Sequence, residues 1–177
     1  GSLVGPVYAA AVILKSKINT KLLKDSKLLS KKDREKLNIY IKKNSYWSIG
    51  KASVKEIEKL NILNASLLAM KRAIMKLKKK PGQILIDGNK IPKIKNYNLK
   101  YVIKGDEKIP EISAASIIAK VSRDRLITKM SKKYIKYSWN KNAGYGTKSH
   151  LLAIKKFGIT KHHRKTFKPI HNMLSLE

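Results

Sequence analysis

The chain has 177 residues, which predicts a single domain that can bury a hydrophobic core. Its 41 basic residues against 11 acidic ones give a formal charge of +30, which favours a polyanionic partner, above all nucleic acid. The absence of cysteine excludes disulfides and thiolate metal sites, and no apolar run is long enough for a membrane-spanning helix. We expect a monomer in the cytoplasm.

The charge has a second explanation. Only five of the 41 basic residues are arginine, and lysine, like isoleucine and asparagine, is encoded by A/T-rich codons. Genomic base composition can therefore supply part of the excess. Because acidic residues are scarce, any two that occur in the same local setting become informative.

The first half of the chain alternates predicted strands and helices. The apolar residues 4–14 predict a buried strand, with a bend at Gly5-Pro6. Ser30 is placed to cap a helix that runs to about residue 43, and residues 45–53 predict a second strand.

A further helical region follows the second strand. Ser53 and Glu56 have the spacing of a capping box, and apolar residues recur at helical spacing over 61–78. Pro81-Gly82 ends this region. The lysine-rich residues 76–80 are interpreted as a solvated helix end rather than a binding site.

Two later strands each deliver an acid to an exit that contains glycine. Residues 83–87 end at Asp87, which Gly88 follows, and residues 99–103 are followed by Lys104, Gly105 and Asp106. If the two strands are neighbours, both carboxylates emerge at one edge of the sheet. Mg²⁺ favours such oxygen ligands, and paired metals can activate water at a phosphodiester.

Pro110 suits the first turn of a helix that continues to about residue 130, and its small side chains let it lie close against a sheet. After a turn at 144–146, Thr147 is placed to cap a helix over 148–157. Strands separated by long helices predict the α/β class.

Several charged residues have structural alternatives. Asp106, Glu107 and Glu111 suit a helix start as well as a metal site, and Asp124 can form an ion pair with a neighbouring arginine. Asp25-Ser26-Lys27 can contact phosphate or simply lead into a helix. Likewise, His162-His163-Arg164 can contact phosphate or anchor the tail.

Longer motifs occur in the order found in bacterial ribonuclease HII, over nearly the whole chain: VGPVYAAAVIL, LIDGNKIPK, VIKGDEKIPEISAASIIAKVSRD, GYGTKSH and HHRKTF. The chain thus resembles that family. The resemblance implies one RNase H-like domain over 1–177, a mixed β-sheet flanked by helices, with a C-terminal helical part at 147–177. It also implies Mg²⁺- or Mn²⁺-dependent cleavage of the RNA strand of RNA–DNA hybrids and of ribonucleotides embedded in duplex DNA, a DNA-repair activity.

By the same resemblance, Asp87 and Asp106 are catalytic, metal-binding acids. Tyr145 matches the tyrosine that stacks on the sugar at the RNA–DNA junction. Ser26 and Lys27 match a segment near the substrate backbone, and Gly1 aligns with the last glycine of a substrate-binding Gly-Arg-Gly.

The chain also departs from the family pattern. The Asp-Glu pair and the Gly-Arg that precede this glycine have no counterpart, so we expect an N-terminally truncated chain that lacks two of four carboxylates. Such a chain should be inactive, with an unpaired edge beside residues 7–14. Leu28 and Asn142-Ala143 replace basic residues, which puts some substrate contacts in doubt. A non-catalytic nucleic-acid binder is the rival interpretation, and a degenerate homologue that keeps only the fold is a third.

Overall fold

The computed structural model describes residues 1–23 and 29–175. The chain forms two compact units, each assembled from separate stretches. The first contains residues 1–7, 52–65 and 122–177, and the second contains residues 8–51 and 66–121. The predicted C-terminal part, 147–177, belongs to the first unit, and the single domain over 1–177 stays a prediction. Across the described ranges, no helix is long and apolar enough to cross a membrane.

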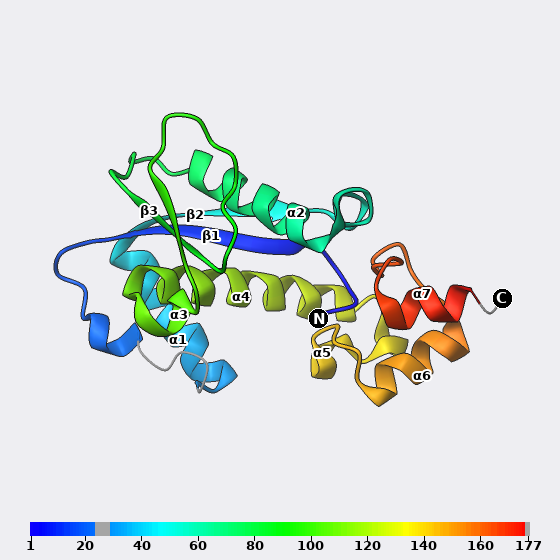
Figure 1. Cartoon of the computed structure of the whole chain (residues 1–177). Helices are drawn as coiled ribbons and strands as arrows, with labels where there is room; N and C mark the ends of the chain where they lie inside the picture. Colours follow the sequence, from blue (N-terminus) through cyan, green and yellow to red (C-terminus); the bar gives the residue numbers. More distant parts are fainter. Residues whose placement is uncertain (24–28, 176–177) are drawn as a thin grey trace. The chain divides into compact units, whose positions relative to one another are not determined.

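The strands and the longer helices follow the predicted order (Figure 1). β1 (Val7–Leu14) pairs with β2 (Ser45–Ala52), and β3 (Ile84–Asp87) pairs with β4 (Leu99–Val102). Among the described strands β1 has only this one neighbour, so its second edge is unpaired, as predicted. The alternation of strands with helices gives the predicted α/β class.

Three predicted helix caps are confirmed. Ser30 accepts a hydrogen bond from the Asp33 amide at the start of α1 (Lys31–Lys43). Before α2 (Val54–Met75), the Ser53 amide donates to Glu56 Oε2 at 2.8 Å and the Glu56 amide donates to Ser53 Oγ at 3.2 Å. Thr147 accepts from the amide of His150 at the start of α6 (Lys148–Phe157). These side chains satisfy amides that lack a partner within the helix.

The helical region is interrupted near residue 61, where the predicted helical spacing of apolar residues begins. Asn61 interrupts α2 with a φ of 66°, and its side-chain oxygen accepts from the Asn64 amide at 3.0 Å, which caps the second segment. This segment ends at Met75, before the expected residue 78. The lysine-rich residues 76–80 therefore follow the helix rather than form its last turn.

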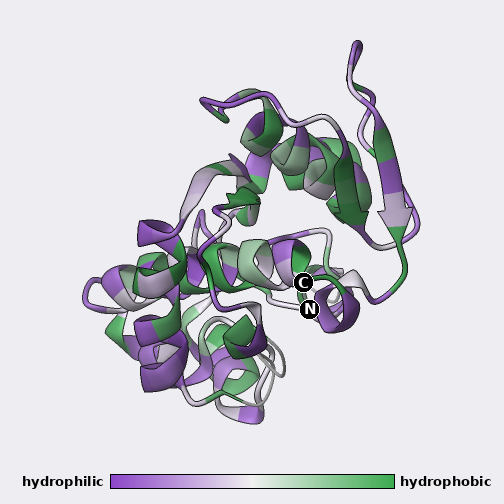
Figure 2. Cartoon of the chain, turned by 90° about the vertical axis from the view of Figure 1, so that its left-hand side faces the viewer, coloured by the Kyte–Doolittle hydropathy of each residue, from purple (hydrophilic) through white to green (hydrophobic). Residues whose placement is uncertain are grey.

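One face of the β1–β2 pair is covered by α1 and by the N-terminal half of α4 (Pro110–Ser131). Of the small residues of α4, Ser113 and Ala114 are buried, and Ala114 belongs to the core beneath the strands. Figure 2 shows hydrophobic and hydrophilic residues alternating along the helices, and the hydrophobic ones fill this core. Its buried members are Ile18, Leu23, Ile41, Ala114, Ile117, Ile118 and Val121.

On the other face, α2 lies directly against β2. A Cβ atom placed on Gly50 would lie 2.0 Å from the carbonyl oxygen of Ala69 and 2.5 Å from the amide nitrogen of Ala73. Ser48 Oγ also donates to the Ala73 carbonyl. Only glycine at position 50 allows this backbone contact.

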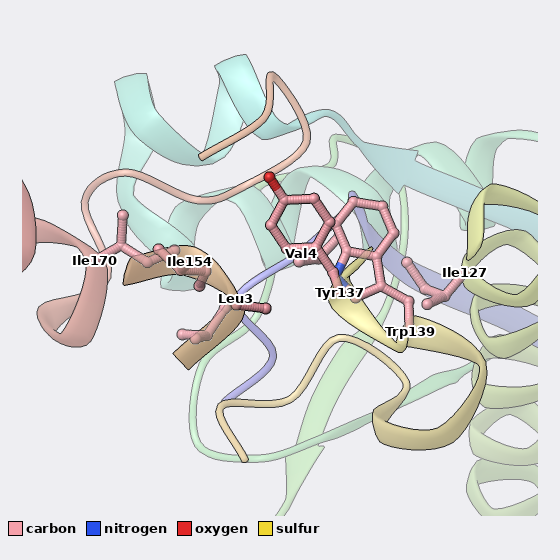
Figure 3. Packing of buried hydrophobic residues seen from close by; sticks show 8 residues of the cluster. Leu3, Val4, Ile127, Tyr137, Trp139, Ile154 and Ile170 are labelled. Atoms are coloured by element: carbon pink, nitrogen blue, oxygen red, sulfur yellow. The ribbon is translucent and has the colours of Figure 1, made fainter. Parts of the chain in front are cut away.

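The first unit has its own core, built on Trp139 and Tyr137 (Figure 3). The two rings stack with centroids 5.3 Å apart. They belong to α5 (Trp139–Asn142) and to the 3-10 helix η2 (Ile135–Tyr137), short elements that the sequence did not predict. α6 and α7 (Lys168–Leu174) add Ile154 and Ile170, and the N-terminal segment adds Leu3 and Val4.

The N-terminal segment of this unit is hydrogen-bonded on both sides. The Leu3 amide donates to the Gly144 carbonyl, and the Leu3 carbonyl accepts from the Arg164 amide, both at 2.8 Å. The Gly5 amide donates to the His162 carbonyl at 2.8 Å. Gly5 has a φ of 79°, so the chain bends there, as predicted.

We expect the Gly50→Ala substitution to destabilise the protein by about 3 kcal/mol, because α2 and β2 must separate to admit the methyl group. Denaturant unfolding monitored by circular dichroism measures the change. Gly82→Ala is the matched control, because a Cβ atom there meets nothing within 4 Å. Equal stability of the two variants would contradict the close contact.

Candidate active site

The two strands that carry the predicted acids are neighbours. β3 and β4 run parallel, in a register that places Ile84 opposite Leu99 and Asp87 opposite Val102. The Gly88 amide continues the ladder with a 3.0 Å bond to the Val102 carbonyl. Because parallel strands end at the same edge of a sheet, Asp87 and the residues after β4 emerge together, as the sequence predicted.

The chain turns sharply after β4. Lys104 has a left-handed conformation (φ 53°, ψ 44°) and leads into α3 (Gly105–Lys108), which lies beside the end of β3 (Figure 1). The Gly105 amide donates to Asp87 Oδ1 at 2.9 Å. The carboxylate of Asp87 is therefore hydrogen-bonded to the residue that directly precedes Asp106.

Asp106 and Glu107 lie in α3, a one-turn helix separate from α4. The sequence interpretation, which put Glu107 in the first turn of the long helix, is wrong on this point. Extended Ile109 (φ −115°, ψ 116°) lies between the two helices. A Cβ atom on buried Gly105 would lie 2.5 Å from Ile112 Cδ1, so glycine lets α3 lie against α4.

The edge supplies a small set of oxygen donors. Asp87 is exposed and Asp106 half-buried. Over the described ranges no group of three or more His, Cys, Asp or Glu side chains could hold a metal ion. Two carboxylates nevertheless suit Mg²⁺, which is commonly bound by one or two carboxylates together with waters and substrate phosphates. Asp87 and Asp106 therefore carry the type of oxygen ligand that a divalent cation takes.

The other predicted site residues lie elsewhere in the chain. Ser26 and Lys27 fall outside the described residues. Gly1 and Tyr145 belong to the first unit, where Ser2 forms an antiparallel bridge with Tyr145. The Tyr145 side chain is 43% exposed, and its ring centroid lies 5.2 Å from the guanidinium carbon of Arg123. The ring is thus held from one side yet accessible to a ligand.

The turn before Tyr145 explains one departure from the family pattern. Asn142 is buried, its Nδ2 donates to the Tyr137 carbonyl at 2.8 Å, and its Oδ1 accepts from the Gly144 amide at 2.8 Å. The Tyr145 amide donates to the Asn142 carbonyl at 2.9 Å. Asn142 therefore shapes the backbone that presents Tyr145.

Two buried histidines support the same turn, and their hydrogen bonds define their tautomers. His150 Nδ1 lies 2.8 Å from the Tyr145 carbonyl, which can only accept, so Nδ1 carries the proton. His150 Nε2 accepts from Trp139 Nε1 at 3.0 Å. His163 Nδ1 accepts from the Thr160 amide at 2.8 Å, so the His163 proton lies on Nε2, 3.3 Å from His150 Nε2. A further proton on His150 Nε2 would oppose the donors Trp139 Nε1 and His163 Nε2, and one on His163 Nδ1 would oppose the Thr160 amide, so both rings are neutral.

Burial also favours the neutral forms. It lowers the pKa of His163 to about 4, with the nearby His150 adding to the effect. Burial lowers the pKa of His150 as well, and the hydrogen bond to the Tyr145 carbonyl partly opposes that shift. Local sequence did not predict this network, because its members are brought together only by the fold.

The tail and the arginines have structural roles. Arg164 is buried and its Nε donates to the Gly5 carbonyl at 2.9 Å, while burial lowers its pKa to about 10. His163 and Arg164 thus anchor the tail, the second of the two alternatives. Arg123 pairs with Asp124 at 3.1 Å, as predicted, and also donates to Ser2 Oγ and to the Ala143 carbonyl.

We expect acid to destabilise the protein through His163. Its pKa falls from about 6.5 in the unfolded chain to about 4 in the folded protein, so the unfolded chain binds the proton more readily. The contribution of neutral His163 to the free energy of unfolding is fully present above pH 6.5. It falls by on the order of 3 kcal/mol as the pH drops to 4.

Chemical denaturation at several pH values measures this loss. His163→Asn keeps an acceptor for the Thr160 amide but cannot titrate, so its stability should vary less over that range. His171→Gln, at an exposed histidine, should retain the parent dependence. An equally steep loss in His163→Asn would contradict the role of His163.

Comparisons with known proteins identify the family of the chain. A family model described as Ribonuclease HII matches residues 1–170. The chain is 71% identical to the ribonuclease HII of Pelagibacter ubique over 174 residues, covering 98% of this chain and 94% of that protein. It is similar to the crystal structure of ribonuclease H2 from Pyrococcus horikoshii, with a TM-score of 0.83 and 26% identity over 99% of this chain and 93% of that one.

A third match is in fold alone. The structure of Bst-RNase HIII in complex with Mn²⁺ has a TM-score of 0.71 and 14% identity, over 99% of this chain and 66% of that one. None of the matches supports the expectation that these 177 residues are inactive. The predicted fold and family are confirmed: the chain belongs to the ribonuclease HII family of endoribonucleases and has its RNase H-like α/β fold.

Proposed function

We propose that this protein hydrolyses the RNA strand of RNA–DNA hybrids, and ribonucleotides embedded in duplex DNA, with Mg²⁺ or Mn²⁺ as cofactor. Family membership supports the class of reaction, and the Mn²⁺ complex of Bst-RNase HIII supports a divalent cation. The observation that carries the site is the 2.9 Å bond from the Gly105 amide to Asp87 Oδ1, directly before Asp106.

Asp87 and Asp106 are the residues that would hold the cation. A divalent cation there would activate a water molecule and stabilise the charge on the leaving oxygen. The Gly105 amide fixes the orientation of the Asp87 carboxylate, so little reorganisation is needed when substrate arrives. α3 keeps Asp106 on the same edge.

The proposed reaction is the hydrolysis of a phosphodiester bond. The oxygen of water bonds to the scissile phosphorus, and the bond from phosphorus to the 3′ oxygen breaks. The 3′ oxygen takes up a proton, which leaves a 3′-hydroxyl and a 5′-phosphate.

Other residues would hold the substrate. In our proposal the exposed ring of Tyr145 stacks on the sugar at the RNA–DNA junction, and Gly1, Ser26 and Lys27 lie near the substrate strand. Surface lysines would bind phosphates in a salt-dependent manner. Family membership favours this enzyme over a non-catalytic binder, for which neither Mg²⁺ nor Asp87 would matter.

Asp87→Asn and Asp106→Asn should each reduce cleavage by at least about 100-fold, because a lost carboxylate weakens charge stabilisation worth several kcal/mol. Gel analysis of a duplex that contains one ribonucleotide, with Mg²⁺ or Mn²⁺, measures this. Exposed Glu111→Gln removes the same charge from α4 and should cleave normally. Full activity in Asp106→Asn would refute its role.

Metal binding has a readout that does not depend on turnover. Titration with Mn²⁺ should broaden the NMR amide signals of Gly105 and Asp106 first, because the Gly105 amide contacts the Asp87 carboxylate. Asp87→Asn should abolish this selectivity and Glu111→Gln should retain it. Uniform broadening along the chain in the parent protein would argue against the site.

Tyr145→Ala should weaken binding of the ribonucleotide-containing duplex roughly fivefold or more, because it removes a stacking ring. Tyr145→Phe keeps the ring and should bind like the parent. The dissociation constants, measured by fluorescence anisotropy, separate the two cases. If the alanine and phenylalanine variants bind the duplex with equal affinity, Tyr145 has no stacking role.

A further inference from the structure

The lysines that follow α2 do not simply extend into solvent. Lys79 Nζ lies 5.5 Å from the ring centroid of Tyr46, and Lys80 Nζ lies 5.3 Å from that of Tyr97. Lys15 Nζ, from a different part of the chain, also lies 5.5 Å from the Tyr46 ring. All five residues belong to the second unit, and we call them the lysine–tyrosine surface.

Four separate segments contribute to this surface. Lys15 follows β1, Tyr46 lies in β2, Lys79 and Lys80 follow α2, and Tyr97 precedes β4. Tyr46 is 42% exposed and Tyr97 half-buried, and all three lysines are exposed. Because Lys79 and Lys80 are consecutive, both tyrosines lie beside the same short segment of the chain.

The chemistry fits a strand with unpaired bases. An aromatic ring offers a stacking partner for a base, and an adjacent ammonium offers a partner for the phosphate; proteins that bind single strands combine the two. In a duplex the base faces are already stacked. A formal charge of +30 adds attraction for any polyanion.

The lysines can move away from the rings with only a small loss of free energy. An exposed cation–π contact contributes only about 0.5–1 kcal/mol, whereas stacking of a base contributes about 1–3 kcal/mol. A bound strand can therefore place its base on the ring and draw the ammonium to its phosphate.

We propose that the lysine–tyrosine surface binds single-stranded DNA. The choice of DNA rests on the proposed function, because repeated cleavage cuts the RNA strand of a hybrid into short pieces that dissociate and leave the DNA strand unpaired. None of the contacts described above joins this surface to Asp87 or Asp106.

Binding is tested by fluorescence anisotropy of labelled oligo(dT), without divalent cations, using the whole chain. The double variant Tyr46→Ala/Tyr97→Ala should bind roughly fivefold more weakly or worse, because it loses the stacking rings. Tyr46→Phe/Tyr97→Phe keeps both rings and is the matched control, with affinity like the parent. Unchanged affinity in the alanine variant would overturn the proposal.

The contribution of the lysines to binding is tested by the salt dependence of the affinity. Lys79→Gln/Lys80→Gln should lower the slope of log affinity against log salt by roughly 0.7 per lysine, the value for single strands. Lys155→Gln/Lys156→Gln removes the same charge from exposed positions of α6 and should change the slope less. Equal effects of the two pairs would show general attraction only and would refute the assignment.

Different variants distinguish a failure of this proposal from a failure of the proposed function. Asp106→Asn should stop cleavage but bind oligo(dT) normally, whereas Tyr46→Ala/Tyr97→Ala should cleave a short, fully paired hybrid at the parent rate. Loss of that cleavage in the tyrosine variant, with its melting temperature unchanged, would place these rings in the catalytic substrate site and refute a separate surface.

Discussion

The register between β3 and β4 is the constraint on which the candidate active site depends. Because Asp87 lies opposite Val102, the chain that leaves β4 can turn back at Lys104 and bring the Gly105 amide to the Asp87 carboxylate. A slip by one residue would turn every side chain of the strand to the other face of the sheet. The hydrogen bond between Asp87 and Gly105 thus couples strand pairing to the placement of both acids.

The two units contribute different chemistry. The second unit offers carboxylates at a sheet edge, whereas the first offers an exposed ring, Tyr145, on a backbone held by neutral imidazoles. His150 bonds to the Tyr145 carbonyl, and Asn142 bonds to the Gly144 amide in the turn before it. Neither of these bonds involves the phenol group of Tyr145. The side chain can therefore meet a ligand while its main chain stays fixed.

Much of the fold could be predicted from the sequence because it depends on local patterns. Caps such as Ser30 and Ser53 act within one helical turn, and the strand-end position of Asp87 follows from its immediate neighbours, so a linear pattern suffices. The left-handed Lys104 and the short helix after it interrupt the expected path from strand to helix, and the close packing of Gly105 against Ile112 is a contact that the linear pattern does not reveal.

The pairing of His150 with His163 and of Lys79 with Tyr46 depends likewise on segments that are distant in sequence.

The two-sided pairing of the N-terminal segment has a consequence for biosynthesis. Leu3 is synthesised well before its partners Gly144 and Arg164, which lie far along the chain. Contacts that close such long loops form slowly, and domains synthesised from the N-terminus leave apolar segments exposed meanwhile. Leu3 and Val4, which are buried in the folded protein, therefore stay exposed until these distant partners have been made.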